Sequence, residues 1–258
     1  MHLSVYTNMK KLLFLLPILL LIVFGFTTKS TNKAKAISHK QWSVLLKRHV
    51  NNKGDVNYKG FLKDEALLNG YLKLLSDNPP DSALSNNEKF AYWINAYNAF
   101  TVKLIIENYP LKSIKDLGSN ATKNSPWDKK FFKIGVKEMT LNNIEHDILR
   151  KQFNDPRLHF AINCASYSCP KLLNKAFEAA TLNRQLNERA VDFLNDPTKN
   201  IITPSSAKLS SILLWYGEDF TKTGVTKIEY INRYSRIKIL PTATIDYLKY
   251  NWGLNEQK

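Results

Sequence analysis

Both cysteines of the chain lie in one short stretch, HFAINCASYSCPKL, which covers residues 159–172. Four residues separate Cys164 from Cys169, and His159 precedes the first cysteine by five. Two thiols and a nearby imidazole are compatible with three kinds of chemistry: a disulfide, a metal site, or a nucleophile with its base. The residues of this stretch alone leave the choice open.

The disulfide interpretation rests on the even cysteine count and on the signs of export described below. Four intervening residues permit a bridge between Cys164 and Cys169 if the loop turns back on itself. A loop this short removes little entropy from the unfolded chain, so the bridge would stabilise the fold only slightly. It is therefore more useful as a redox element than as a staple.

The nucleophile interpretation takes Cys164 as the reactive thiol, because it follows an apolar run and enters a polar turn. Backbone amides that point at its sulfur would favour the thiolate. We predict that His146 is the base and that Glu145, its neighbour in sequence, orients the imidazole. Asn95, an amide within an apolar helix, is predicted to orient a side chain or to stabilise an oxyanion.

Five further residues are predicted to line this site: His159, Ser168, Cys169, Trp127 and Trp93. Alternation along residues 157–163, interpreted as a buried strand, places His159 and Cys164 on opposite faces unless the strand ends first. His159 is therefore a weaker candidate for the base than His146. Ser168 is the next available hydroxyl in the loop, and a Trp in a long polar loop, such as Trp127, often lines a cleft.

Two other interpretations stay open. One is a metal site, in which a zinc-like set of nitrogen and sulfur ligands would come from His146, His159, Cys164 and Cys169. Their spacing is not that of a zinc finger, and we expect neither a metal nor a cofactor. Alternatively, the domain is a non-catalytic binding module. Its groove for a peptide or glycan would be formed by Tyr92, Trp93, Tyr97, Trp127, Trp215, Tyr216 and Trp252.

Helices must position most of these side chains. A capping box from Ser85 to Glu88, followed by apolar residues spaced by three and four, predicts the helix that carries Asn95 and Asn98. Each of these amides either caps a neighbouring loop or has a functional role. A second helix is predicted over LNNIEHDILR, residues 141–150, and it carries Glu145 and His146.

The remaining elements are short. Helices are predicted over residues 38–51, 61–76 and 177–195, with two more near the C-terminus, and a hairpin over residues 131–140. Residues 200–203 and 207–209 are predicted to pair as strands. Because the strands lack regular βαβ spacing, the sequence predicts an α+β fold: a helix-rich single domain with a small, mostly antiparallel sheet.

The N-terminus indicates export. From Met9, two lysines precede about fifteen apolar residues, and a small-residue site follows at Ala34-Lys35-Ala36. We therefore predict a signal peptide over residues 1–36 and one domain over residues 37–258, located in the periplasm or secreted. The alternative is an uncleaved N-terminal anchor, which would be the only contact with the membrane.

The formal net charge of the chain is +15; beyond residue 36, 32 basic side chains face 22 acidic ones, which leaves +10. The lysines are scattered, without a run of five, so we expect no nucleic-acid partner. An exported protein of this kind is expected to meet a peptide, amide or glycan-type substrate in the cell envelope.

The order WINAYNA, LNNIEHDILR, HFAINCASYSCP, LLWYGEDF and YLKYNWGLN resembles the domain of unknown function 547 family, over about residues 41–255. The resemblance implies exported bacterial relatives, and a papain-like or transglutaminase-like fold is a further expectation. The matching positions are Asn95, Glu145, His146, His159, Cys164, Ser168, Cys169 and Pro170. We predict a thiol-dependent hydrolase or acyl transferase acting on amide or ester bonds, or alternatively a non-catalytic envelope domain with a Cys164–Cys169 disulfide.

Overall fold

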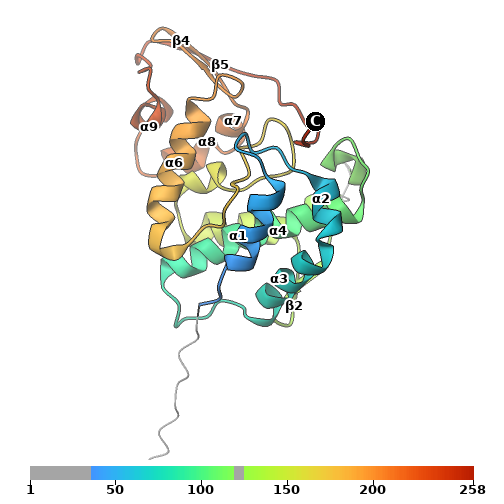
Figure 1. Ribbon diagram of the computed structural model, residues 1–258. Helices are drawn as coiled ribbons and strands as arrows, with labels where there is room; N and C mark the ends of the chain where they lie inside the picture. The colour runs from blue at the N-terminus through green and yellow to red at the C-terminus, as the bar shows by residue number, and fades with distance from the viewer. Residues whose placement is uncertain (1–35, 119–124) are drawn as a thin grey trace, which may run out of the picture. The chain divides into compact units, whose positions relative to one another are not determined.

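Four N-terminal helices form the first part of the fold. The computed structural model describes residues 36–118 and 125–258, so the predicted signal peptide lies outside the described residues except for Ala36. The helices are α1 (Lys40–His49), α2 (Tyr58–Lys63), α3 (Glu65–Asp77) and α4 (Asn86–Glu107), and they gather around α4 (Figure 1).

Helix α4 is the central element of this part. Ser85 accepts a hydrogen bond from the backbone of Glu88, and the Glu88 side chain accepts from the backbone of Ser85, so the predicted capping box is formed. Sixteen of its 22 residues are buried, which means that the helix packs against neighbours on nearly all sides. The two asparagines inside it must therefore find partners within the protein.

A hairpin covers one flank of α4. Strands β1 (Phe132–Ile134) and β2 (Lys137–Met139) pair antiparallel, and Gly135 adopts the positive φ of +59° that their tight turn requires. The ring of Phe132 stacks on that of Phe100 in α4 with centroids 3.9 Å apart. The predicted hairpin is confirmed.

The C-terminal part consists of short helices beside a three-stranded sheet (Figure 1). Its elements are α6 (Leu182–Leu194), β3 (Ile201–Ile202), β4 (Ser206–Leu209), α7 (Ile212–Trp215), α8 (Gly217–Thr221), α9 (Lys227–Tyr234) and β5 (Thr244–Tyr247). Strand β4 lies in the middle, antiparallel to β3 and parallel to β5. The predicted helix-rich α+β domain with a small sheet is confirmed.

Two hydrophobic clusters correspond to these two parts. The first contains the buried apolar side chains of α1 to α4, of the hairpin and of the start of α6, and the second those of the end of α6, of α7 to α9 and of β4. Phe160 belongs to the second cluster and Ala161 to the first, so the chain crosses between the clusters directly before Cys164. The cysteine loop therefore lies where side chains of both parts can reach it.

The segment before Cys164 is not the strand predicted over residues 157–163. It forms a 3₁₀-helix, η4 (Pro156–Phe160), whose start is capped by the Asp155 side chain accepting from the backbone of Arg157. Proline at the first position suits a helix start, because its missing N–H would have no partner there. A short apolar run buried on all sides gives no periodicity that separates a strand from a helical turn.

The predicted helix at residues 141–150 is formed, but mostly as a π-helix, η3 (Asn143–Leu149), followed by one turn of α-helix, α5 (Arg150–Gln152). The other short 3₁₀ elements are η1 (Ile114–Leu117), η2 (Pro126–Asp128) and η5 (Ala179–Thr181). Across the described ranges, no helix combines the length and apolar character needed to cross a membrane.

Candidate functional site

A cleft of about 840 Å³ opens between the two hydrophobic clusters. Glu145, His146, His159, Cys164 and Cys169 all line it. Its aromatic lining comes from α4, η2, α7 and the C-terminal segment: Tyr97, Trp127, Trp215, Tyr216, Tyr250 and Trp252. Segments far apart in the sequence thus bring sulfur, imidazole and carboxylate groups to one cavity.

The two cysteines form a disulfide, with their Cα atoms 6.2 Å apart. Cys169 is buried, whereas Cys164 is only partly buried and borders the cleft. The Cys164 sulfur lies 3.3 Å from the hydroxyl of Tyr250 and 3.1 Å from that of Ser166. Burial raises the pKa of Tyr250, so its hydroxyl stays protonated and is available as a donor at neutral pH.

Asn98 is one of the two asparagines whose side-chain amides lie inside the apolar helix α4. Its Oδ1 accepts from the backbone N–H of Asn163 at 2.8 Å, and its Nδ2 donates to the carbonyl of Ala161 at 3.0 Å. Both halves of this buried amide are satisfied by the segment that leads into Cys164. Asn98 therefore fixes the position of the segment before Cys164 relative to α4.

Asn95 does not line the cleft, which corrects the prediction that it acts there. It is fully buried, and its amide accepts from the N–H of Phe177 and donates to the carbonyl of the same residue, at 2.9 and 2.8 Å. Both halves of the amide thus hold the Phe177 backbone, and the side chain lies away from the cleft. The alternative, that such an amide caps a neighbouring loop, describes both asparagines of α4.

Hydrogen bonds from the side chain of Asn163 connect the two ends of the cysteine loop. The side chain of Asn163 accepts from the N–H of Ala165 and donates to the carbonyl of Pro170, so it joins the two ends of the cysteine loop. Ala165 has φ of +60°, a left-handed conformation that costs a non-glycine residue about 1 kcal/mol. Residues in such conformations are concentrated at functional sites, where neighbouring contacts enforce them.

The π-helix determines which side chains of η3 face the cleft. In a π-helix the hydrogen bonds run from i to i+5; here the N–H of Arg150, the residue after η3, donates to the carbonyl of Glu145, so residues i, i+1 and i+5 lie on one side. Glu145, His146 and Arg150 all line the cleft as a result. A regular α-helix would spread these three side chains over a wider arc, and π-turns are frequent at functional sites.

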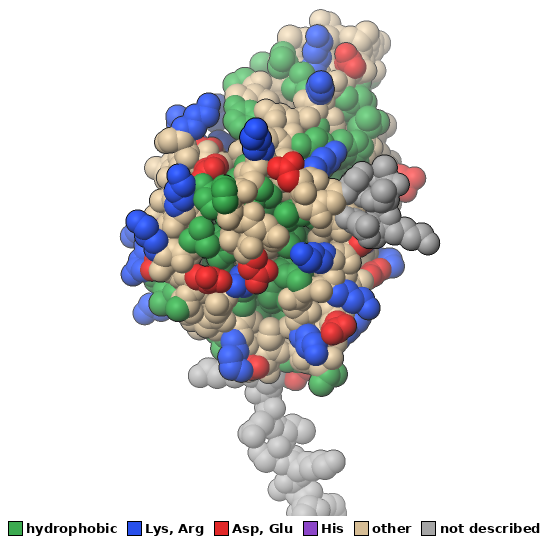
Figure 2. Space-filling view, turned by 90° about the vertical axis from the view of Figure 1, so that its right-hand side faces the viewer, with side chains coloured by type: hydrophobic (Ala, Val, Ile, Leu, Met, Phe, Trp, Pro, Cys, Tyr) green, Lys and Arg blue, Asp and Glu red, His purple; other side chains and the backbone are tan. Residues whose placement is uncertain are grey.

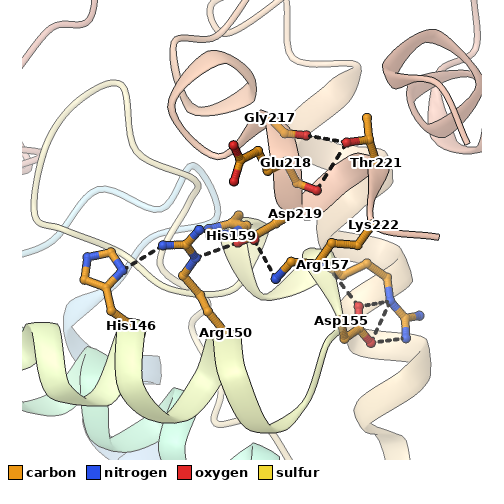
Figure 3. Close-up of polar contacts among 10 residues, drawn as sticks. All are labelled: His146, Arg150, Asp155, Arg157, His159, Gly217, Glu218, Asp219, Thr221 and Lys222. Atoms are coloured by element: carbon orange, nitrogen blue, oxygen red, sulfur yellow. Dashed lines mark hydrogen bonds and ion pairs between the residues drawn. The ribbon is translucent and has the colours of Figure 1, made fainter. Parts of the chain in front are cut away.

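Arg150 joins the two histidines of the cleft through Asp219 of α8 (Figure 3). Its Nη1 lies 3.1 Å from Nδ1 of His146, while Nε and Nη2 donate to the two carboxylate oxygens of Asp219 at 2.6 and 3.1 Å. Asp219 also contacts Nε2 of His159 at 2.8 Å and Nζ of Lys222 at 2.9 Å. The result is a continuous relay between His146 and His159.

The charges of this relay are fixed by their neighbours. Burial alone would raise the pKa of Asp219, but hydrogen bonds from His159, Arg150 and Lys222 outweigh it and hold the pKa well below its usual value. The carboxylate is ionised and can only accept, so Nε2 of His159 carries the proton. Burial lowers the pKa of His159 itself, against the opposing hydrogen bond to Asp219.

His146 has the opposite tautomer. Arg150 has donors only, so Nδ1 of His146 must accept from it and the ring proton lies on Nε2. Glu145 does not hold His146 as predicted. Its carboxylate instead faces the hydroxyls of Tyr97 and Tyr216; burial, followed by the charge and hydrogen bonding of Glu145, raises the pKa of both phenols.

Of the other residues predicted to line the site, one lines the cleft and two do not. Trp127 lines the cleft, as expected. Trp93 and Ser168 do not line the cleft. Trp93 is buried in the first cluster beside Tyr92, and Ser168 exchanges backbone and side-chain hydrogen bonds with Asn251. Among residues 36–118 and 125–258, no three histidine, cysteine or carboxylate side chains are arranged to hold a metal ion.

Three polar residues of the site were not predicted as members: Arg150, Asp219 and Tyr250. Arg150 and Asp219 lie inside the motifs LNNIEHDILR and LLWYGEDF, and Tyr250 lies in YLKYNWGLN. The motifs thus contained the signal, but nothing in sequence spacing says that Asp219 meets His159 across 60 residues.

Residues 82–194 match the model of one protein family. The description of this family is "Protein of unknown function, DUF547". This segment holds α4, the π-helix and the cysteine loop. Residues 82–194 are thus similar to the DUF547 family. The resemblance predicted from the motifs is thereby confirmed, although the family match ends before Asp219 and the C-terminal aromatic residues of the cleft.

Searches among curated proteins and among solved structures gave no match. The expected similarity to papain-like or transglutaminase-like enzymes stays a prediction. The description of the DUF547 family assigns it no activity.

Proposed function

We propose that the DUF547 region and its C-terminal partner segment form a thiol-dependent hydrolase or acyl transferase acting on amide or ester bonds. The observation that carries this proposal is that Cys164 shares one cleft with His159, whose Nε2 is held by the buried carboxylate of Asp219. A nucleophile, a base and a group that orients the base are the requirements of this chemistry.

Hydrogen bonding assigns different roles to the two histidines. His159 donates from Nε2 to Asp219, which leaves the lone pair of Nδ1 to accept a proton from the reduced Cys164 thiol. His146 was the base expected from the sequence, but its Nδ1 is engaged by Arg150 and its Nε2 carries the proton. It is therefore suited to donate to an oxyanion, not to remove a proton.

The proposed reaction follows the usual order for a thiol enzyme. The Cys164 thiolate attacks the carbonyl carbon, and the tetrahedral oxyanion accepts hydrogen bonds from His146 Nε2–H and the Tyr250 hydroxyl. The imidazolium of His159 returns the proton to the leaving amine or alcohol. Water, or another acceptor in a transferase, then releases the acyl group from Cys164 with His159 again acting as base.

The test is activity of the purified chain on a panel of fluorogenic amides and esters, with and without prior reduction by dithiothreitol. We expect turnover only after reduction, loss of turnover in Cys164→Ala, and retained turnover in the matched Cys169→Ala variant. Equal activity of Cys164→Ala and the wild type would refute the proposal.

A second candidate function is a non-catalytic binding domain for a peptide or glycan. The observation that favours it is that the disulfide engages Cys164 while six aromatic side chains line the same cleft. On this account, a soluble glycan or peptide library binds the oxidised protein, and binding is unchanged in Cys164→Ala.

The proposed place of action is the cell envelope or the exterior, with residues 1–36 directing export. The support is the sequence of the N-terminal segment and a surface whose lysines and arginines are scattered among acidic side chains, as the face in Figure 2 illustrates. Mass spectrometry of the chain recovered from cell fractions tests this: cleavage after Ala36 is expected, and a full-length chain in the cytoplasm contradicts it.

A further inference from the structure

The Cys164–Cys169 disulfide differs from a structural staple in the position of its two sulfurs. Cys164 is partly exposed to the cleft that contains the two histidines, whereas Cys169 is only 6% exposed and lies in the wall shared with a second, polar cleft of about 960 Å³. Both cysteines line the first cleft, but Cys164 is the less buried, so an external thiol that enters it reaches the sulfur of Cys164 more readily.

The buried sulfur is prepared to leave. The backbone N–H of Cys164 donates a hydrogen bond to the sulfur of Cys169 at 2.9 Å. When the bond between the sulfurs breaks, negative charge develops on the leaving sulfur, and a donor already directed at it lowers the energy of the thiolate. Attack at Cys164 with departure of Cys169 is thus the favoured direction of exchange.

The loop between the cysteines makes hydrogen bonds that do not involve the disulfide. Asn163 joins Ala165 to Pro170 through its side chain, and the N–H groups of Tyr167 and Ser168 donate to the carbonyls of Gly253 and Asn251. A bridge that closes so short a loop adds little stability in any case. The two thiols therefore stay close after reduction and can reform the bond.

We propose that Cys164 and Cys169 are a reversible redox couple, that a small or protein dithiol reduces it through Cys164, and that the reduction releases Cys164 as the nucleophile. The last clause rests on the proposed function, but the first two do not. In the oxidised protein Cys164 has no thiol to attack a substrate, so the couple would switch the cleft between an inactive and an active form.

The exchange proceeds in two steps. A thiolate of the dithiol attacks the sulfur of Cys164, a new S–S bond forms between them, and Cys169 departs as a thiolate. The second thiolate of the reductant then attacks the reductant's own sulfur in this mixed disulfide, which releases Cys164 and closes the reductant's disulfide. The two thiol protons of the reductant end on Cys164 and Cys169, and two electrons pass to the protein.

The first test uses the full chain and needs no substrate. Cys169→Ser and Cys164→Ser are each incubated with oxidised glutathione under native conditions and weighed by mass spectrometry. The glutathione adduct is expected on Cys164 of Cys169→Ser and to form about tenfold faster there than on Cys169 of Cys164→Ser, because Cys164 is the less buried of the two cysteines at the cleft. Circular dichroism of both variants checks that they are folded.

A second measurement concerns the wild type. Equilibration with dithiothreitol buffers of graded ratio, followed by alkylation, is expected to give a reversible two-electron transition in the folded protein. The redox proposal is overturned if the disulfide resists excess dithiol until the chain is unfolded, or if both cysteines form the adduct at the same rate.

The same samples separate this proposal from the proposed function. If the couple titrates as expected but the reduced protein turns over no amide or ester, the redox couple stands and the hydrolase proposal fails. If Cys169→Ser is active only after dithiothreitol, although it has no disulfide to reduce, the switch is refuted while the hydrolase remains.

Discussion

Asp219 Oδ2 lies 2.8 Å from Nε2 of His159, and the same carboxylate binds two nitrogens of Arg150. One buried acid therefore orients a histidine of the η4 segment and an arginine of the helix that follows η3. His159 and Asp219 lie 60 residues apart in the sequence, and their side chains are only 1% and 5% exposed. We regard this pair as the positioning device of the site.

Replacing Asp219 should impair both activity and stability. In Asp219→Asn the amide can no longer accept from His159, Arg150 and Lys222 at once, and the ring of His159 is free to take the wrong tautomer. Turnover is expected to fall about 10³-fold, and the free energy of unfolding by about 3 kcal/mol because a buried ion pair loses one partner. Steady-state kinetics and urea denaturation measure the two effects. Turnover within threefold of the wild type would remove Asp219 from the mechanism.

Acidic pH should destabilise the fold through buried histidines. Burial lowers the pKa of His39 to about 4, and burial also lowers that of His159, against the opposing influence of Asp219 and Glu145. Between the unfolded pKa of about 6.5 and the folded value, the unfolded chain binds more protons, so stability falls as pH falls through this window.

For His39 the loss amounts to about 3 kcal/mol between pH 6.5 and pH 4. The His39→Gln variant should therefore show a flatter dependence of the urea midpoint on pH than the wild type, measured from pH 8 to pH 4. Parallel curves for the two proteins would contradict the assignment. Asp219 contributes in the same direction but only at lower pH, since its pKa is depressed and its ionised form stabilises the fold above pH 4.

Asn98 is predicted to hold the cysteine loop. Asn98→Ala leaves the N–H of Asn163 and the carbonyl of Ala161 without partners inside the protein, which should cost about 2–4 kcal/mol. Asn69→Ala, at an exposed position of α3, is the matched control and should change stability by less than about 0.5 kcal/mol. Thermal and urea unfolding compare the two; equal effects would mean that the buried amide is not needed.

Trp215 is predicted to bind substrate in the cleft without supporting the fold. It is 49% exposed, and its ring stacks on that of Trp252 with centroids 5.8 Å apart. Trp215→Ala should raise KM about tenfold with little change in kcat, since it removes binding that ground state and transition state share. Leu214, its equally exposed neighbour outside the cleft, is the control: Leu214→Ala should leave KM unchanged.

The sequence predicted elements whose signals are local. The capping box of α4, the turn at Gly135 and the spacing of apolar residues in α1 each depend on a few neighbouring side chains, and each element is present. The segment at residues 157–163 was misinterpreted because its apolar run is buried on every side, so its hydrophobic pattern has no period to read.

The site was predictable only in part for a related reason. Cys164, His146, Glu145 and His159 were identified from residue type and motif, and all of them line the cleft. Their partners were not, because hydrogen bonds such as that between His159 and Asp219 depend on how the two parts of the chain pack. The π-helix, which turns Arg150 toward His146, has no established signature in local sequence.

The most direct test of the account is the rate of Cys164 alkylation as a function of pH in the reduced protein, compared between the wild type, His159→Asn and His146→Asn. If His159 is the base, Cys164 in the wild type reacts with an apparent pKa well below the value of about 8.5 for a free thiol. That pKa should rise toward the free value in His159→Asn and change little in His146→Asn. A wild-type profile that already follows a free thiol, or one that only His146→Asn alters, would contradict the assignment of nucleophile and base.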